Sequence, residues 1–236
     1  MNDPENEKQI LARIRAGSRR ARSVTIAEEL EALPRPEAAR MPAESLLTSF
    51  LCNVLRNGGS AALVRDRREA VEELSQFISS RHGQRRVVAG HDPRLAAMPW
   101  RDGGLLPRFG VAGAGDAVAV SYARDAIAET GSVVLWANRD NPALNNLLPD
   151  DHVVFVNGAD IHARMESMWE REELSDALRR PRAIMMVSGP SSTADIEMQL
   201  VLGAHGPRAW HVIVIDPKGP AGARDSLSEA RALAAV

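Results

Sequence analysis

The stretch that decides the fold class is Val153-Val154-Phe155-Val156, a continuous apolar run rich in β-branched residues. Further runs of similar length and character lie before and after it: Ala117-Val118-Ala119-Val120, Ser132-Val133-Val134-Leu135-Trp136, Ala183-Ile184-Met185-Met186-Val187 and Val212-Ile213-Val214-Ile215. Near-continuous runs of this kind suit strands that are covered on both faces. The sequence therefore predicts an α/β fold with a central parallel or mixed sheet flanked by helices.

The first half of the chain alternates between helical and strand patterns. Helices are predicted from Pro42 to about Asn57 and over 67–81, and short strands over 61–64 and 86–89. Residues 90–110 contain three prolines and two adjacent glycines, so we expect mostly loop there. A long amphipathic helix is expected over about 160–179.

The chain divides into three predicted parts. Residues 1–41 form an N-terminal helical arm and linker, in which Thr25 and Glu28 have capping-box spacing and prolines follow. Residues 42–220 form the α/β domain, and residues 221–236 form a C-terminal tail with a short alanine-rich helix, expected to be loosely attached.

Composition limits the classes of function. The 29 basic and 31 acidic residues leave a formal net charge of −2, and aromatic residues make up 4%, which argues against a nucleic-acid partner. The single cysteine, Cys52, lies in an apolar helical pattern typical of a buried structural thiol, and one thiol cannot ligate an iron–sulfur cluster. No apolar run approaches the roughly 20 residues of a membrane span, and the polar start is no secretory signal, so a cytoplasmic location is expected.

Several familiar chemistries lack their motifs. The chain has no P-loop, and its Gly110-Val111-Ala112-Gly113-Ala114-Gly115 segment has the dinucleotide-binding spacing reversed. Gly189-Pro190-Ser191-Ser192-Thr193 ends in threonine where a nucleophile elbow needs glycine. None of the six histidines has helical metal-ligand spacing to another, so we predict no metal site.

The strongest local signal is Ser191-Ser192-Thr193, which follows an apolar strand and the Gly189-Pro190 turn. We expect a helix to begin here, and unpaired N–H groups beside hydroxyls at a helix start can bind an anion or a carboxylate. Ser192 and Asp195 also have capping spacing, so the same residues can serve only to start the helix. Both interpretations remain open.

Two shorter segments supply further candidates. Glu129, with Thr130 and Gly131 beside it, precedes a strand and is a candidate base or nucleophile, or else an exposed glutamate at the end of a helical turn. His205, between an expected helix end at Gly203 and a Gly-Pro turn, can donate to a bound anion or to a nearby carbonyl.

The three segments, in this order, resemble the LUD-domain family of lactate-utilisation C proteins: Ala-Glu-Thr-Gly-Ser at 128–132, Gly-Pro-Ser-Ser-Thr-Ala-Asp-Ile-Glu at 189–197 and Leu-Gly-Ala-His-Gly-Pro at 202–207. The resemblance covers about 50–220. One departure is Ser192, where many relatives are expected to have a basic residue.

The resemblance implies a fold similar to CoA-transferase and ribose-isomerase-like proteins. It also implies a non-redox subunit of an L-lactate-oxidising system that binds iron–sulfur partner subunits and a small carboxylate or another anion, with no cofactor of its own. The ligand site would comprise Gly189, Ser191, Ser192, Thr193, His205, Thr130 and Gly131. The alternative is a stand-alone enzyme acting on an acyl-CoA, a sugar phosphate or a nucleotide through Glu129 and the Ser191–Thr193 turn.

Overall fold

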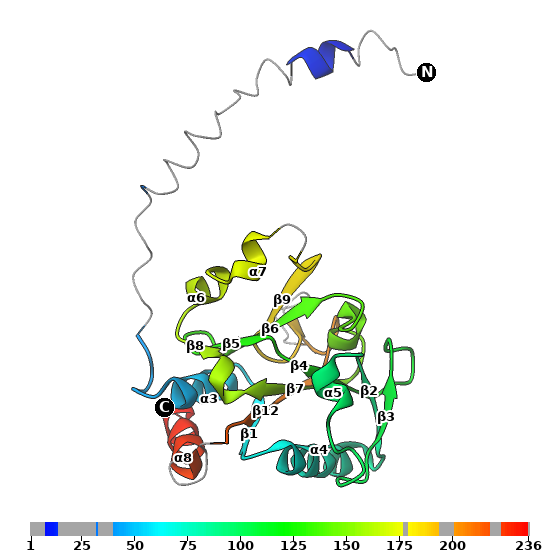
Figure 1. Cartoon of the computed structure of the whole chain (residues 1–236), viewed down its shortest axis with the longest axis vertical. Coiled ribbons are helices and arrows are strands. Elements are labelled where there is room, and N and C mark those ends of the chain that lie inside the picture. Colours follow the sequence, from blue (N-terminus) through cyan, green and yellow to red (C-terminus); the bar gives the residue numbers. More distant parts are fainter. Residues whose placement is uncertain are drawn as a thin grey trace. The chain divides into compact units, whose positions relative to one another are not determined.

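The computed structural model describes residues 8–13, 32, 40–176, 179–193, 201–217 and 223–235 (Figure 1). The chain separates into two compact units, Met1–Ala38 and Ala39–Val236. In the first unit residues 8–13 are helical, and the predicted capping box at Thr25 and Glu28 lies outside the described residues. All of the architecture below belongs to the second unit.

A six-stranded sheet forms the centre of this unit. Its order is β1 (Ser60–Val64), β12 (Ala209–Ile215), β7 (Asp151–Asn157), β4 (Val118–Tyr122), β2 (Arg86–Ala89) and β3 (Leu106–Phe109). Every neighbouring pair is parallel. The predicted α/β fold with a central parallel or mixed sheet flanked by helices is confirmed.

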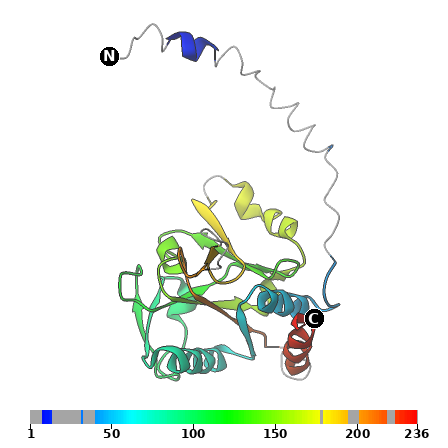
Figure 2. The ribbon, with the colours of Figure 1, turned by 180° about the vertical axis from the view of Figure 1, so that it is seen from behind.

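Side chains alternate between the two faces of this sheet, as the period of a strand requires. On β7, Val153 and Phe155 pack with the helix α4 (Arg67–His82), whereas Val154 and Val156 pack on the other face with α3 (Leu46–Arg56) and α8 (Ala223–Ala234). The helices α3 and α8 lie side by side (Figures 1 and 2). Both faces are therefore covered, which explains the near-continuous apolar runs.

The strands of a second sheet are interleaved in sequence with those of the central one. Its order is β8 (Ile161–His162), β5 (Asp125–Ile127), β6 (Ser132–Ala137) and β9 (Ala183–Val187). The β5–β6 and β6–β9 pairs are antiparallel, and β5–β8 is parallel. Two of the five apolar runs that decide the fold class, 132–136 and 183–187, thus belong to this second sheet rather than to the central one.

Several predicted elements match and others do not. The strands β2 and β9 have the predicted bounds, and α4 extends one residue beyond its prediction. The loop region 90–110 also contains α5 (Pro93–Ala96) and β3. The long helix expected over 160–179 is wrong: Ile161 and His162 pair with β5, and short helices α6 (Met165–Trp169) and α7 (Glu172–Ser175) follow.

The C-terminal segment is not loosely attached. Ala230 of α8 is fully buried in the same cluster as Phe50 and Leu51 of α3, and Arg56 donates to the backbone oxygen of Leu233 over 2.8 Å. The prediction of a loose tail after residue 220 is therefore wrong for the described residues 223–235. Alanine-rich helices pack closely because their small side chains let another helix approach.

Candidate functional site

The segment around Glu129 forms a turn that is held by the end of α3. Asn53 Nδ2 donates to the backbone oxygens of Ala128 over 2.8 Å and of Glu129 over 3.1 Å. Asn57 Nδ2 donates to the backbone oxygen of Thr130 over 2.8 Å. The sequence analysis missed both asparagines, although polar residues four apart beside an apolar helical face indicate a contact with a partner loop.

Two glycines let their turns approach α3 closely. Gly131 has a φ of +65°, and a Cβ added there would lie 2.5 Å from the backbone carbon of Asn53. Gly189 has a φ of +121°, and its Cβ would lie 2.4 Å from the backbone oxygen of Asn57. Only glycine suits such positions, because the positive φ and the close backbone both exclude a side chain.

The structure brings two of the predicted segments together through a chain of hydroxyls. Thr130 Oγ1 lies 2.7 Å from Ser132 Oγ, which lies 2.5 Å from Ser188 Oγ. Ser132 is only 3% exposed. These hydroxyls connect β6 to the end of β9, so their hydrogen bonds support the turn geometry.

The Ser191–Thr193 segment is a hairpin strand and not the start of a helix. Ser192 and Thr193 form β10 (Ser192–Thr193), which pairs antiparallel with β11 (Val201–Leu202). Ser191 N donates to Pro207 O, and Gly203 N donates to Ser191 O, each over 2.8 Å. The predicted helix start is therefore wrong for Ser192 and Thr193, as is the helix end expected at Gly203; residues 194–200, with Asp195, lie outside the described part.

The other two candidates, Glu129 and His205, have different surroundings. Glu129 Oε1 accepts from Met165 N over 2.9 Å, which places this carboxylate at the first turn of α6. The prediction that Glu129 ends a helical turn is wrong, because this residue lies in the turn between the strands β5 and β6. His205 is exposed in the turn after β11. Among the described residues no hydrogen bond joins Glu129 or His205 to Ser191, Ser192 or Thr193, so their shared ligand site stays a prediction.

A pocket that the sequence analysis did not foresee lies where the strand order of the central sheet reverses. From β2 the chain moves outward to β3, then returns to β4 on the other side of β2 and continues to β7 and β12. In open α/β sheets, ligands bind beyond the carboxyl ends of the strands at such a switch point. The carboxyl ends of β2 and β4 are Ala89 and Tyr122.

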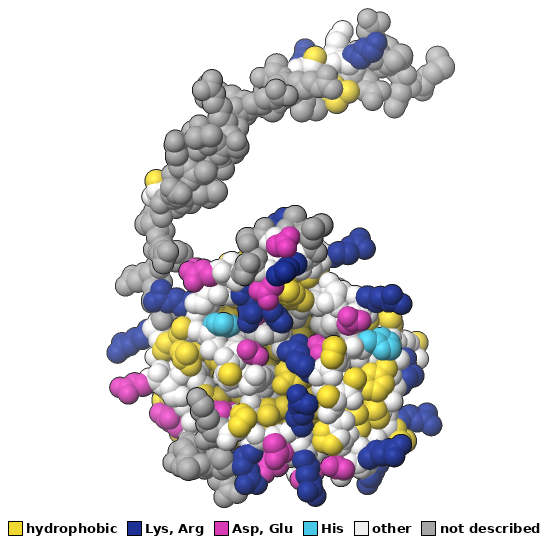
Figure 3. Space-filling model, in the orientation of Figure 1, with side chains coloured by type: hydrophobic (Ala, Val, Ile, Leu, Met, Phe, Trp, Pro, Cys, Tyr) yellow, Lys and Arg dark blue, Asp and Glu magenta, His cyan; other side chains and the backbone are white. Residues whose placement is uncertain are grey.

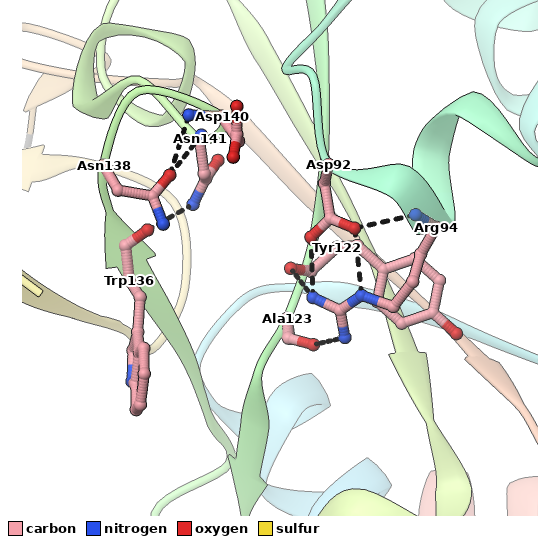
Figure 4. A network of polar contacts seen from close by, with 8 residues as sticks. All are labelled: Asp92, Arg94, Tyr122, Ala123, Trp136, Asn138, Asp140 and Asn141. Carbon is pink, nitrogen blue, oxygen red and sulfur yellow. Dashed lines mark hydrogen bonds and ion pairs between the residues drawn. The ribbon is translucent and has the colours of Figure 1, made fainter. Parts of the chain in front are cut away.

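This switch-point pocket has a volume of about 180 Å³. Its lining comes from the loop after β2, the end of β4 and the residues following it, and the end of β6 with its loop: Asp92, Pro93, Arg94, Tyr122, Arg124, Trp136, Asn138, Asp140 and Asn141. Figure 4 shows Asp92 and Arg94, which follow β2, beside the end of β4 on one side, and the residues of β6 and its loop on the other. Both sheets therefore contribute to the pocket.

One wall of the pocket is an aromatic and ionic stack. The Arg94 guanidinium lies over the Tyr122 ring, 4.2 Å from its centroid, and contacts both carboxylate oxygens of Asp92. Burial raises the pKa of the Tyr122 phenol above its ordinary value, and the nearby Arg94 opposes this only in part. Tyr122 therefore remains protonated near neutral pH.

A buried serine–histidine pair nearby is structural. His152 Nε2 lies 3.0 Å from Ser121 Oγ, and Ser121 Oγ donates to Asn146 Oδ1 over 2.7 Å. Because the serine proton points to Asn146, His152 must donate to the serine oxygen and cannot act as its base. Burial lowers the pKa of His152 to about 3, so the ring is neutral.

The family model of the LUD domain matches residues 116–215. Residues 116–215 are therefore similar to a LUD domain. The matched range contains β4, β7, β12 and the second sheet, and with them Tyr122, Arg124, Trp136 and Asp140 of the pocket. Asp92 and Arg94 lie before it.

Several curated relatives of this chain share one description. "Lactate utilization protein C" of Macrococcus caseolyticus is 29% identical over 203 residues, which cover 78% of this chain and 87% of the relative. The protein of that description from Bacillus subtilis is 34% identical over 102 residues, 42% of each chain. A crystal structure of a DUF162 family protein from Deinococcus radiodurans matches with a TM-score of 0.53 at 21% identity, covering 72% of this chain and 96% of that one, and it supports the fold.

Proposed function

We propose that this chain is a non-redox subunit of a cytoplasmic L-lactate-oxidising system and that it assembles with iron–sulfur-containing subunits. The observation that carries the proposal is the 203-residue alignment with a relative named for lactate utilisation, which spans most of both chains. In the described part of the chain no helix is both long enough and apolar enough to span a membrane.

The properties of the single thiol support a non-redox role. Cys52 is fully buried in α3, and burial raises the pKa of its thiol, opposed only in part by Arg56. A protonated, inaccessible thiol is a poor nucleophile and a poor metal ligand. Iron–sulfur clusters are held by several cysteine thiolates, so in this proposal the redox centres belong to the partner subunits.

Affinity purification tests this assembly. The full-length chain, tagged and expressed in its native host, is purified anaerobically and analysed for bound proteins and for iron, with the untagged strain as the control. We expect cysteine-rich subunits and iron to be retained with the tagged chain. Recovery of the tagged chain alone, without iron and without partners, would contradict the proposal.

A further inference from the structure

The size and place of the switch-point pocket limit its ligand. The pocket has a volume of about 180 Å³. Pockets for drug-sized molecules start at about 300 Å³. The pocket therefore suits a molecule of a few non-hydrogen atoms and is too small for a nucleotide.

Arg94 is a fixed part of the pocket wall. Its Nε and one terminal nitrogen donate to Asp92 over 3.1 and 2.7 Å, and the other terminal nitrogen donates to the backbone oxygen of Ala123 over 2.9 Å. Its ring stack on Tyr122 completes the arrangement, which Figure 4 shows from close by. Because Asp92 already balances its charge, Arg94 shapes the pocket rather than offering a free cation.

Arg124 is held in place but retains donors. Its guanidinium lies over the Trp136 ring, 5.0 Å from the centroid, and donates to Glu173 on α7 over 2.5 Å. Its Nε is buried and has no hydrogen-bond partner among the residues that the structure describes. An arginine has five N–H donors in a planar fork, which matches the two oxygens of a carboxylate. The Arg124 side chain is 37% exposed and lines the pocket, so its terminal donors can receive one.

Asp140 provides the complementary acceptor. The loop that carries it is pinned by Asn138 Oδ1, which accepts from the backbone nitrogens of Asp140 and Asn141, each over 2.8 Å. Asn141 Nδ2 in turn donates to the backbone oxygen of Trp136 over 3.2 Å. In the described part of the chain the Asp140 carboxylate itself has no hydrogen bond or ion pair, so it is free to accept a hydroxyl proton (Figure 4).

The charges of the pocket disfavour a dianion. Two arginines and two aspartates line it, and Glu173 already contacts Arg124, so a dianionic phosphate would meet an excess of negative charge. On the face drawn in Figure 3, basic and acidic side chains are likewise interspersed. A short acid with one carboxylate and one adjacent hydroxyl can contact both the Arg124 guanidinium and the Asp140 carboxylate.

We propose that the switch-point pocket binds a short 2-hydroxy monocarboxylate, with the carboxylate on Arg124 and the hydroxyl donating to Asp140. The choice of L-lactate among such acids rests on the proposed function. The class of ligand, a short 2-hydroxy monocarboxylate, is inferred from the residues of the pocket and does not depend on the proposed function. An L-2-amino acid has the same shape and also carries a donor next to its carboxylate, so L-alanine is the decisive competitor.

Calorimetric titration of the full-length chain tests the proposal with L-lactate, with propionate, which lacks the hydroxyl, and with L-alanine. We expect saturable binding of L-lactate, with propionate weaker by about tenfold or more, since it lacks a hydrogen bond to a charged group. L-alanine, whose ammonium can also donate to Asp140, separates a hydroxy-acid site, which binds it more weakly than L-lactate, from an amino-acid site. Arg124→Gln is expected to weaken L-lactate by about tenfold or more. Asp140→Ala is expected to bring L-lactate and propionate to the same affinity.

The matched control is Arg86→Gln, an exposed arginine at the opposite end of β2, which should leave every affinity unchanged. Asp140 is exposed, so Asp140→Ala remains informative if Arg124→Gln fails to fold. Absence of L-lactate binding, tighter binding of L-alanine, or affinities unaffected by both pocket variants would overturn the assignment. Retention of iron-containing partners is measured separately, so a failure of this site is distinguishable from a failure of the assembly.

Discussion

A Cβ added to Gly90 would lie 2.2 Å from the backbone oxygen of Asp140. The buried glycine after β2 thus fixes how closely the loop after β6 approaches the central sheet, and this approach sets the width of the switch-point pocket. Because the nearest atoms belong to backbone and not to a flexible side chain, a side chain at position 90 must displace the loop.

The variant Gly90→Ala is therefore expected to destabilise the fold by about 1–3 kcal/mol, as overpacking does, and to weaken L-lactate binding by moving Asp140. Urea unfolding and the titration described above measure the two effects. Gly113→Ala is the matched control, because the nearest atom to its added Cβ is Asp116 Oδ2 at 3.9 Å. Equal stability of the two variants would show that the loop yields without cost.

Two buried histidines should make the fold sensitive to acid. Burial lowers the pKa of His152 to about 3 and that of His211 to about 4, from an ordinary 6.5. Below about pH 6.5 the unfolded chain takes up protons that the folded chain does not. The part of the unfolding free energy that comes from the two neutral histidines is thus fully present above that pH and is lost as the pH falls toward 4. Glu73, whose pKa burial raises and which lies 3.8 Å from His211, opposes part of this loss.

Urea unfolding at several pH values checks this slope. His211→Gln is expected to make the loss of unfolding free energy shallower by about 1 kcal/mol per pH unit between about pH 6 and pH 4.5, because one proton fewer is taken up on unfolding. His205→Gln, a change at an exposed position, should leave the slope as it is. A slope that His211→Gln does not alter would mean that other groups govern the acid response.

The buried Asp125 depends on its two cationic neighbours. Its side chain is fully buried, and its Oδ1 contacts Arg171 and, over 2.8 Å, His162 Nε2. Arg171→Gln should cost about 3 kcal/mol, since it leaves a buried carboxylate without its strongest partner. Adding Asp125→Asn to that variant should recover part of the loss.

Chemical unfolding of the single and double variants measures this coupling. Arg179→Gln removes a solvent-exposed pair with Asp176 and should change stability by less than about 0.5 kcal/mol. If Arg171→Gln is as mild as Arg179→Gln, the Asp125 cluster is solvated rather than sealed beneath α6 and α7.

The contact between α3 and the Glu129 turn gives a further expectation. Asn53→Ala leaves two backbone oxygens without their donor and should cost about 1–3 kcal/mol, whereas Asn57→Ala removes one exposed hydrogen bond and should cost less. Thermal unfolding of both variants compares them. The reverse order of stability would refute the role given to Asn53.

The apolar runs of the sequence predicted strands well but not the sheets to which they belong. The runs 132–136 and 153–156 have the same character, yet the first pairs antiparallel with β5 and β9 and the second lies at the centre of the parallel sheet. Burial determines the composition of a strand, whereas its partners depend on contacts distant in sequence. The same limit explains Ser192 and Thr193, whose capping pattern is local but whose partner is β11.

The pocket could not be found from motifs, because its residues come from separate segments with no fixed spacing. Asp92 and Arg94 follow β2, Arg124 follows β4, and Asp140 follows β6. What the sequence does offer is charged residues just after predicted strands, and these become a site only when the strand order is known. The sequence correctly predicts the turn at Gly189, although the contact of this glycine with α3 depends on the fold.

The central claim, a role in L-lactate oxidation, is tested most directly by deleting the chain from its native host and measuring L-lactate-dependent dye reduction in anaerobic extracts. The account predicts that the deletion abolishes this activity, that purified full-length chain restores it, and that Arg86→Gln restores it equally well. L-lactate oxidation that proceeds unchanged without the chain would contradict the account.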